Sequence, residues 1–286
     1  MKVQVGDIRL FFDVEGAQVV PDGPWMRERP TVILIHTGPG ADHSSYKDHV
    51  GPALAGVAQV VYLDVRGAGR SDRSTPERWN LDTWADDLVG FCEALEIARP
   101  VVLGTAFGAF TAVRARFRHP GFCSRLVLVS AVARYSHTRS VTVFDRLGGP
   151  AAGETAARYF ANPSEATFVE FLRVCVPLYT RTALSPDVVA RMEMNIELGA
   201  YFDAAESRTF DLRDEVRDLD CPTLVLAGED DPTTTLSGAR ELVSAMPPGI
   251  VRFEVFDHAG HGVFRDRPEA IELVRDFVSA AAEPSA

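Results

Sequence analysis

One tight turn has the residue types and spacing of a catalytic turn. It is the segment G-T-A-F-G at residues 104–108, and it directly follows the apolar run at 101–103. Glycines two residues before and after the centre allow a strained backbone to project the central side chain above a sheet. A G-x-S-x-G turn presents a nucleophilic serine in this way. Here the centre is Ala106, so the turn has the frame for nucleophilic catalysis without the hydroxyl.

Two later segments supply the carboxylate and the imidazole that such a nucleophile needs. Asp231 lies shortly after one apolar run, and His261 follows Gly260 after the next. A neutral imidazole can accept the hydroxyl proton and later return it to the leaving group, while a carboxylate on its other nitrogen holds the productive tautomer. Asp230 and His258 are the alternatives, and the spacing favours Asp231 and His261.

The elements around these segments alternate between strands and helices. Runs that are apolar almost throughout are typical of a parallel sheet covered on both faces. We predict strands over 31–35, 59–63, 101–103, 125–129, 222–226 and 251–255, helices over 81–97, 107–119 and 268–281, and an edge hairpin over 2–5 and 8–13. This alternation predicts an α/β fold with a doubly wound, mostly parallel sheet.

One long segment breaks the alternation. Between residues 132 and 211 no convincing strand occurs, and the apolar spacing predicts helices over 155–161, 166–175 and 186–200. Helices inserted between two strands of a sheet suggest a cap. We therefore expect a helical cap at 132–211, inserted into a core that comprises residues 1–131 and 212–286.

Together these segments resemble the α/β-hydrolase superfamily, and in particular its proline iminopeptidase-like branch. The segment H-T-G-P-G at 36–40 is similar to the H-G-G-P-G turn of that branch, with Thr37 in place of the first glycine. The segment D-V-R-G-A-G-R-S at 64–71 resembles its D-x-R-G-x-G-x-S turn. The resemblance covers nearly the whole chain and implies an α/β-hydrolase fold.

The resemblance also implies a role for individual residues. Ala106, Asp231 and His261 follow the family order of nucleophile, acid and base, and the backbone N–H groups of Gly38 and Phe107 would form the oxyanion hole. The family nucleophile is a serine, so we expect serine at position 106 in the active form. The implied activity is hydrolysis of a small ester, lactone or amide through an acyl-enzyme.

The predicted cap is rich in aromatic residues, which would form the wall of a substrate pocket. The residues that we expect to contact the substrate are Tyr159, Phe168, Tyr179 and Tyr201. Glu193, Glu197 and Glu206 could hold an ammonium group, as an aminopeptidase requires, but a solvated helical face is the favoured interpretation. The alternating arginines of 114–118 are also predicted to form a solvated face.

Composition limits the partners. The chain is 46% hydrophobic and 24% charged, so it can bury a large core. Its net charge of -11 disfavours nucleic acid or an anionic membrane as a partner, because phosphate groups bind basic surfaces. No apolar stretch approaches the roughly 20 residues of a membrane span, and no secretory signal is recognisable. We expect a cytoplasmic protein with a small-molecule substrate, and its oligomeric state stays open.

No cofactor is expected. Cysteines and histidines nowhere have metal-ligand spacing, and the glycine turns lack the G-x-G-x-x-G context of a dinucleotide site. The dispersed cysteines are expected to be free thiols, namely Cys92, Cys123, Cys175 and Cys221. The remaining histidines are expected to be solvated or capping groups, namely His43, His49, His119 and His137.

Two other classes of function remain open. An aspartate at position 106 would make the protein an epoxide hydrolase or dehalogenase, which attacks carbon directly. Alternatively, Ala106 belongs to a non-catalytic binding protein that kept the pocket. A binding protein has no need of Asp231 and His261 together, which favours the hydrolase.

Overall fold

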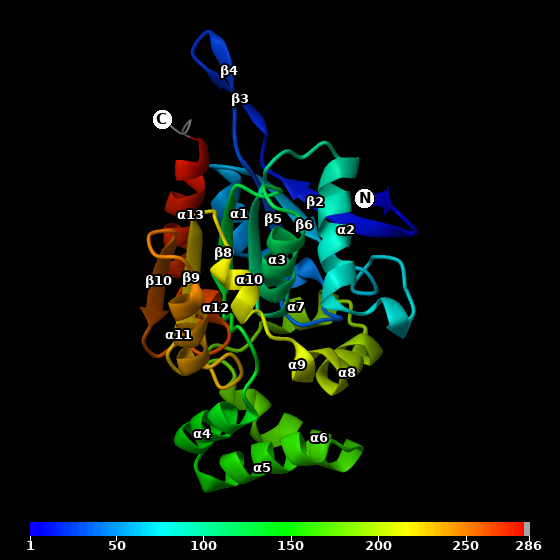
Figure 1. Ribbon diagram of the computed structural model, residues 1–286, viewed down its shortest axis with the longest axis vertical. Coiled ribbons are helices and arrows are strands. Elements are labelled where there is room, and N and C mark those ends of the chain that lie inside the picture. The colour runs from blue at the N-terminus through cyan, green and yellow to red at the C-terminus, as the bar shows by residue number, and fades with distance from the viewer. Residues whose placement is uncertain (283–286) are drawn as a thin grey trace.

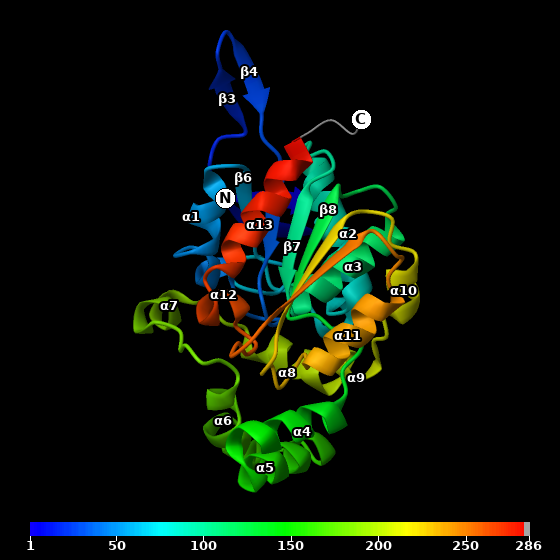
Figure 2. The same ribbon diagram turned by 90° about the vertical axis from the view of Figure 1, so that its left-hand side faces the viewer.

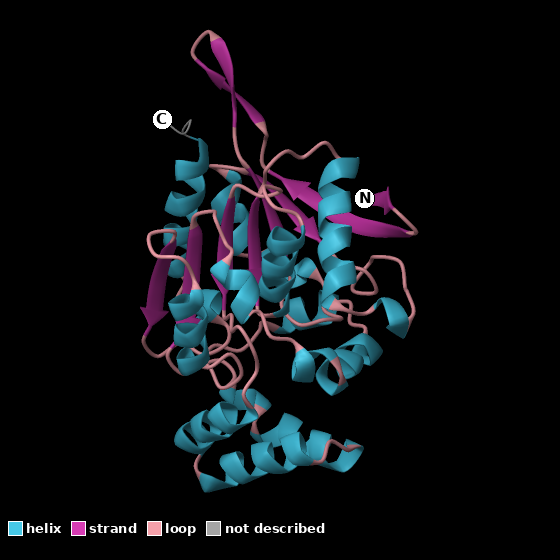
Figure 3. Cartoon of the chain, viewed as in Figure 1, coloured by secondary structure: helices cyan, strands magenta, loops and turns pink. Residues whose placement is uncertain are grey.

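The computed structural model describes residues 1–282, and its centre is an eight-stranded sheet (Figures 1 and 3). The strand order is β1-β2-β6-β5-β7-β8-β9-β10. The strands are β1 (Lys2–Val5), β2 (Ile8–Glu15), β6 (Gln59–Leu63), β5 (Thr31–Ile35), β7 (Val101–Thr105), β8 (Arg125–Val129), β9 (Thr223–Gly228) and β10 (Val251–Phe256). From β6 to β10 all pairs are parallel, whereas β1 and β2 form the antiparallel edge. The prediction of a mostly parallel α/β sheet with an edge hairpin is confirmed.

Helices cover both faces of the sheet, which explains why β5, β7 and β9 are buried along their whole length. One face packs on α2 (Leu81–Ala94), α3 (Phe107–Arg118), α10 (Arg213–Arg217) and α11 (Leu236–Ala245). The other face packs on α1 (Val50–Ala55), α12 (Val263–Asp266) and α13 (Ala270–Ser279) (Figure 2). The chain also contains the 3₁₀ helices η1 (His43–Tyr46), η2 (Pro76–Arg78), η3 (Val176–Leu178) and η4 (Ala280–Ala282).

A helical cap lies beyond the carboxyl ends of the parallel strands (Figures 1 and 2). All of its helices come between β8 and β9: α4 (His137–Gly148), α5 (Pro150–Ala161), α6 (Glu165–Val174), α7 (Pro186–Arg191), α8 (Ile196–Ala204) and α9 (Glu206–Thr209). The helices α4, α5 and α6 form a bundle with its own small core around Phe144 and Phe171. The helices α8 and α9 lie closer to the sheet, where Leu198 and Phe202 join the main core.

The helix expected over 186–200 is in fact two helices. Met192 has an extended backbone, and the side chain of Asn195 accepts a hydrogen bond from the N–H of Leu198 to begin α8. The N–H of Asn195 donates to the carbonyl of Gly40 at 2.7 Å. This contact with the core fixes the break between the two helices.

Two features of the core differ from the sequence prediction. The hairpin of β3 (Val19–Asp22) and β4 (Trp25–Glu28) projects from the end of the molecule opposite the cap, and it was not predicted (Figure 1). Of the three arginines of α3, only Arg118 is exposed, so they do not form the solvated face expected. Arg116 is buried and pairs with Asp220, and Arg114 bridges to α10 through Glu215 at 3.0 Å.

Candidate active site

The turn between β7 and α3 holds Ala106 in a strained conformation. Its φ of 49° and ψ of -109° lie outside the regions that residues with a Cβ normally adopt. The flanking glycines are needed for close packing. A Cβ on Gly104 would lie 2.2 Å from the carbonyl carbon of Gly108, and a Cβ on Gly108 would lie 2.4 Å from the carbonyl oxygen of Ile35. The sequence therefore builds the sharp turn that a projecting nucleophile requires.

Asp231 and His261 are brought together beside this turn. The Nδ1 of His261 lies 2.9 Å from Oδ2 of Asp231, which is buried. The carboxylate also accepts hydrogen bonds from the N–H groups of Thr233 and Thr234, at 2.8 and 2.9 Å, and from both hydroxyls. Burial alone would raise the pKa of Asp231, but the His261 charge and these hydrogen bonds lower it to about 2. The carboxylate of Asp231 is therefore ionised in the folded protein near neutral pH.

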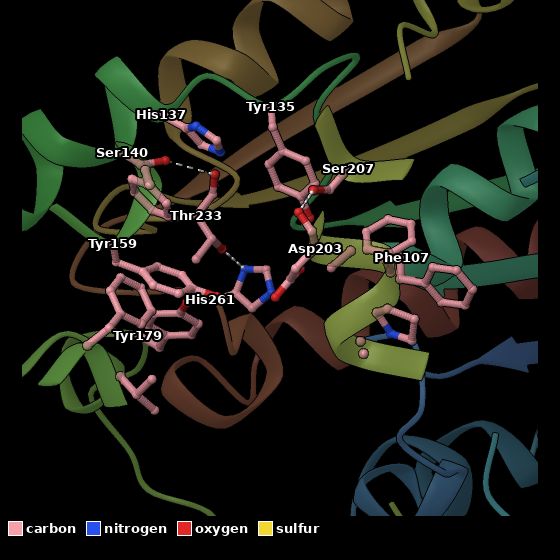
Figure 4. A pocket seen from close by; sticks show the side chains of 18 of the residues that line it. Phe107, Tyr135, His137, Ser140, Tyr159, Tyr179, Asp203, Ser207, Thr233 and His261 are labelled. Atoms are coloured by element: carbon pink, nitrogen blue, oxygen red, sulfur yellow. Dashed lines mark hydrogen bonds between the residues drawn. The ribbon is translucent and has the colours of Figure 1, made fainter. Parts of the chain in front are cut away.

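The backbone around His261 is also fixed. Its N–H donates to the carbonyl oxygen of Tyr179 at 2.6 Å, and its own carbonyl accepts from the hydroxyl of Ser130 at 2.9 Å. Because Nδ1 faces Asp231, the other ring nitrogen is left for the pocket that His261 lines (Figure 4). This is the position that a general base needs.

The turn after β5 can supply an oxyanion hole. Gly38 has a φ of 63°, which glycine adopts without strain, and Phe107 is the first residue of α3, so its N–H has no acceptor within the helix. The buried His36 ring supports both residues. Val65 N–H donates to its Nε2, its Nδ1 lies 3.2 Å from the carbonyl oxygen of Gly38, and it stacks on Phe107. Burial lowers the pKa of His36, which keeps the ring neutral.

The segment 64–71 forms hydrogen bonds that hold the residues around the candidate site in place. Asp64 is fully buried and accepts hydrogen bonds from the N–H and the Nδ1 of His43, at 3.0 and 2.7 Å. His43 is therefore a buried structural group rather than the solvated or capping group expected. The carbonyl of Gly67 accepts from the side chain of Asn195 at 2.8 Å, which ties this turn to the cap.

A pocket of about 320 Å³ lies between this site and the cap. Ala106 and His261 line it on the core side, and Tyr159, Phe168 and Tyr179 line it on the cap side. Figure 4 shows the side chains of His261, Tyr159 and Tyr179 in this pocket. The structure thus brings together the predicted triad positions, the oxyanion turn and three of the four aromatic residues expected to contact substrate.

Tyr201, the fourth, lies outside the pocket. Its ring packs edge-on against Trp79 with the ring centroids 5.5 Å apart, because α8 turns this side chain toward the core. The expectation that Tyr201 contacts substrate is corrected accordingly.

The glutamates that could have held an ammonium group do not line the pocket. Glu193 pairs with Arg70 at 3.3 Å, and Glu206 accepts a hydrogen bond from the first N–H of α2, while Glu197 lies elsewhere on α8. The carboxylate that does line the pocket is Asp203, which sequence reasoning missed. Asp203 is exposed to the pocket, and partial desolvation there raises its pKa to about 6.

Within residues 1–282, no group of three or more histidine, cysteine or acidic residues could hold a metal ion. The four cysteines are buried and unbridged. In the same range, no helix is both long enough and apolar enough to cross a bilayer.

Comparisons with known proteins agree with this geometry. Residues 30–268 match the family model of the alpha/beta hydrolase fold. The RutD protein of Caulobacter sp. strain K31, whose name provisionally assigns carbamate hydrolysis, is 28% identical over 284 residues, which are 96% of this chain and 97% of that one. The 2-hydroxymuconate semialdehyde hydrolase of Pseudomonas sp. strain CF600 is 26% identical over 264 residues, 88% of this chain and 87% of the relative.

The crystal structure of a proline iminopeptidase from Mycobacterium smegmatis superposes with a TM-score of 0.76 at 21% identity, covering 99% of this chain and 98% of that one. The enol-lactonase of Burkholderia xenovorans LB400 superposes with a TM-score of 0.69 at 22% identity, covering 98% and 100%. These two structures share the fold. With the family model matching most of its length, the chain belongs to the α/β-hydrolase family.

Proposed function

We propose that this protein, when serine occupies position 106, hydrolyses a small-molecule ester, lactone or amide through an acyl-enzyme. Ala106 makes the present chain an inactive form that retains the pocket. The observation that carries the proposal is the strained backbone of Ala106, with φ 49° and ψ -109°, next to the buried pair of Asp231 and His261. Such strain costs about 1–3 kcal/mol, and a methyl side chain gains nothing from it.

The proposed reaction uses these groups in two steps. A serine hydroxyl at position 106 gives its proton to Nε2 of His261 and attacks the substrate carbonyl carbon, while the N–H groups of Gly38 and Phe107 stabilise the oxyanion. His261 then passes the proton to the leaving group, and water repeats the sequence on the acyl-enzyme. Asp231 holds the imidazole tautomer and stabilises its cation.

The pocket supports a substrate with a hydrophobic part. Tyr159 and Phe168 form an aromatic wall of the pocket. This wall is extended by Phe160, Phe171 and Leu172. The names of two relatives give a carbamate and a semialdehyde as the compounds hydrolysed, and both are carbonyl compounds. We therefore propose that the aromatic wall binds the acyl or alcohol group of the substrate.

Turnover of chromogenic esters tests the proposal. The Ala106→Ser variant should hydrolyse p-nitrophenyl acetate and butyrate at least about 10³-fold faster than the chain with Ala106, because the nucleophile and base act as a unit. The double variant Ala106→Ser/His261→Ala is the control and should lose this gain. A folded Ala106→Ser protein that matches the parent chain on every ester would contradict the proposal.

A small-molecule binding protein is the second candidate, and Ala106 itself is the observation that favours it. In that case Asp231→Asn should leave ligand binding unchanged and Ala106→Ser should add no activity. An aspartate nucleophile would instead be indicated if Ala106→Asp opened epoxides or displaced halide.

A further inference from the structure

The pocket contains two charged side chains without charged partners. Asp203, on α8, and Arg208, on α9, both line it, and neither forms an ion pair within 4.0 Å among residues 1–282. The Asp203 carboxylate also accepts no hydrogen bond within that range. By contrast, the buried carboxylates of Asp64, Asp230 and Asp231 each accept two or more. Asp203 is exposed, so solvent reaches its carboxylate in the pocket, and a ligand that displaces this solvent has to supply a hydrogen-bond donor in its place.

Aromatic rings surround this carboxylate. Burial raises the pKa of three phenols, and the negative charge of Asp203 is the second cause of the rise. These phenols, which therefore lie near Asp203, are Tyr135, Tyr159 and Tyr179. Figure 4 shows Asp203 directed into the same space as the imidazole of His261. A substrate whose carbonyl lies at Ala106 would therefore also extend past Asp203.

The charge of Arg208 limits which donor suits Asp203. Its Nε donates to the carbonyl oxygen of Asp203 at 3.2 Å, which holds the guanidinium close to the carboxylate without pairing with it. The attraction of a substrate ammonium to Asp203 would be offset by the repulsion of this cation, and the attraction of a substrate carboxylate to Arg208 would be offset by the repulsion of Asp203. A neutral hydroxyl avoids both repulsions. It donates to the carboxylate, and it accepts from the carboxyl once that group is protonated.

We propose that Asp203 binds a hydroxyl group of the substrate, so that the preferred substrates are hydroxy-substituted esters, lactones or amides. This assignment deepens the proposed function and rests on it. The hydroxyl lies under the cap, between Asp203 and the three tyrosines, while the carbonyl occupies the oxyanion turn of Gly38.

Binding to the chain with Ala106 tests the assignment without turnover. The probes are methyl hexanoate, its 3-, 4-, 5- and 6-hydroxy derivatives, and the corresponding amino derivatives, measured by calorimetry or by competition with a fluorescent ester. At least one hydroxy isomer should bind about tenfold more tightly than methyl hexanoate, as expected for a hydrogen bond to a charged acceptor. No amino isomer should match it.

Three variants separate this explanation from general effects on the pocket. Asp203→Leu should abolish the preference for the hydroxyl, whereas Asp203→Asn should retain part of it, because an amide oxygen still accepts. Asp214→Leu, at an exposed position on α10, is the matched control and should change nothing. Thermal unfolding of each variant checks that it folds.

Each outcome of these measurements either supports or overturns the assignment of a substrate hydroxyl to Asp203. The assignment is overturned if an amino isomer binds most tightly or if the hydroxyl preference survives Asp203→Leu. It is also overturned if no hydroxy isomer is preferred, which includes the case in which no ester binds measurably. Hydrolysis of plain esters by Ala106→Ser without any hydroxyl preference would overturn this assignment and leave the proposed function standing. A hydroxyl preference in a chain whose Ala106→Ser variant is inactive would overturn only the hydrolase function.

Discussion

Asp230 and Asp231 are adjacent in the sequence, but their carboxylates bind different parts of the molecule. Asp231 contacts the Nδ1 of His261 at 2.9 Å, whereas Asp230 accepts hydrogen bonds from Arg146 and Arg181, at 2.6 and 2.5 Å. Arg146 belongs to α4, and Arg181 follows η3. One loop therefore orients His261, the base of the proposed reaction, and anchors the cap.

This division of roles predicts different defects for the two aspartates. In the Ala106→Ser background, Asp231→Asn should lower kcat by about 10⁴-fold, because the imidazole loses its tautomer and its counter-charge. Asp230→Asn should instead raise KM several-fold for esters with long acyl chains and change kcat for p-nitrophenyl acetate little. Steady-state kinetics on both esters measures the difference, and equal kcat losses in the two variants would contradict the assignment.

Stability should depend on Asp231 at acid pH. Its pKa is about 2 in the folded chain and near 3.8 ordinarily, so the ionised form stabilises the fold above pH 4. This contribution, about 2 kcal/mol, should be lost as the pH falls from 4 to 2. Urea unfolding across this range should show a steeper loss for the parent chain than for Asp231→Asn. Parallel curves for the two proteins would rule out the low pKa.

Asp203 should have the opposite effect. Its pKa is raised from 3.8 to about 6, so ionisation destabilises the folded protein, and the loss develops as the pH rises from 4 through 6. Because the carboxyl still faces water in the pocket, we expect Asp203→Asn to stabilise by only about 1 kcal/mol at pH 7.5. At pH 4 the gain should vanish. A gain independent of pH would point to packing instead.

The cap aromatics should determine substrate preference. Phe168→Ala should lower kcat/KM for p-nitrophenyl octanoate about tenfold or more in the Ala106→Ser background, because the acyl chain loses an apolar contact, and should leave the acetate nearly unaffected. Phe117→Ala is the control, since its side chain is similarly exposed, at 43% against 39%, but lies on α3 away from the pocket. Similar losses on both esters would count against the pocket assignment.

The strained turn should be sensitive to a single methyl group. Gly104→Ala would place a Cβ 2.2 Å from the backbone of Gly108, so it should destabilise the protein by about 3 kcal/mol or more. Gly56→Ala adds a methyl with no atom within 4 Å and should be nearly neutral. Thermal or urea unfolding of both variants gives the comparison. A neutral Gly104→Ala would contradict the close packing of this turn.

The parts of the fold and of the site that the sequence predicts correctly are those marked by a pattern of neighbouring residues. The strands β5 and β8 are short and apolar after their first residue, so their limits could be predicted to the residue. The positions of Ala106 and His261 depend on glycine-containing turns, which have a sequence signature. Local backbone requirements thus reveal both the sheet and the loops that carry the triad positions.

Features that depend on tertiary contacts could not be predicted in this way. The roles of Thr233 and Asp203 depend on what the folded chain brings beside them, and only the run of three threonines after Pro232 hinted at the first. Tyr201 has the same residue type as Tyr179, but it packs on the core because of the angle at which α8 lies. Likewise, Arg116 is buried and pairs with Asp220, which lies between α10 and β9, and helical spacing cannot reveal this contact.

The role of position 106 can be tested by the intact mass of the Ala106→Ser protein after treatment with a fluorophosphonate. The parent chain and Ala106→Ser/His261→Ala are measured beside it. Only a serine activated by His261 at a working oxyanion hole reacts stoichiometrically with this reagent. We predict one adduct per chain on Ala106→Ser and none on the other two proteins. A correctly folded Ala106→Ser protein that stays unlabelled would contradict the claim that Ala106 occupies the nucleophile position of a serine hydrolase.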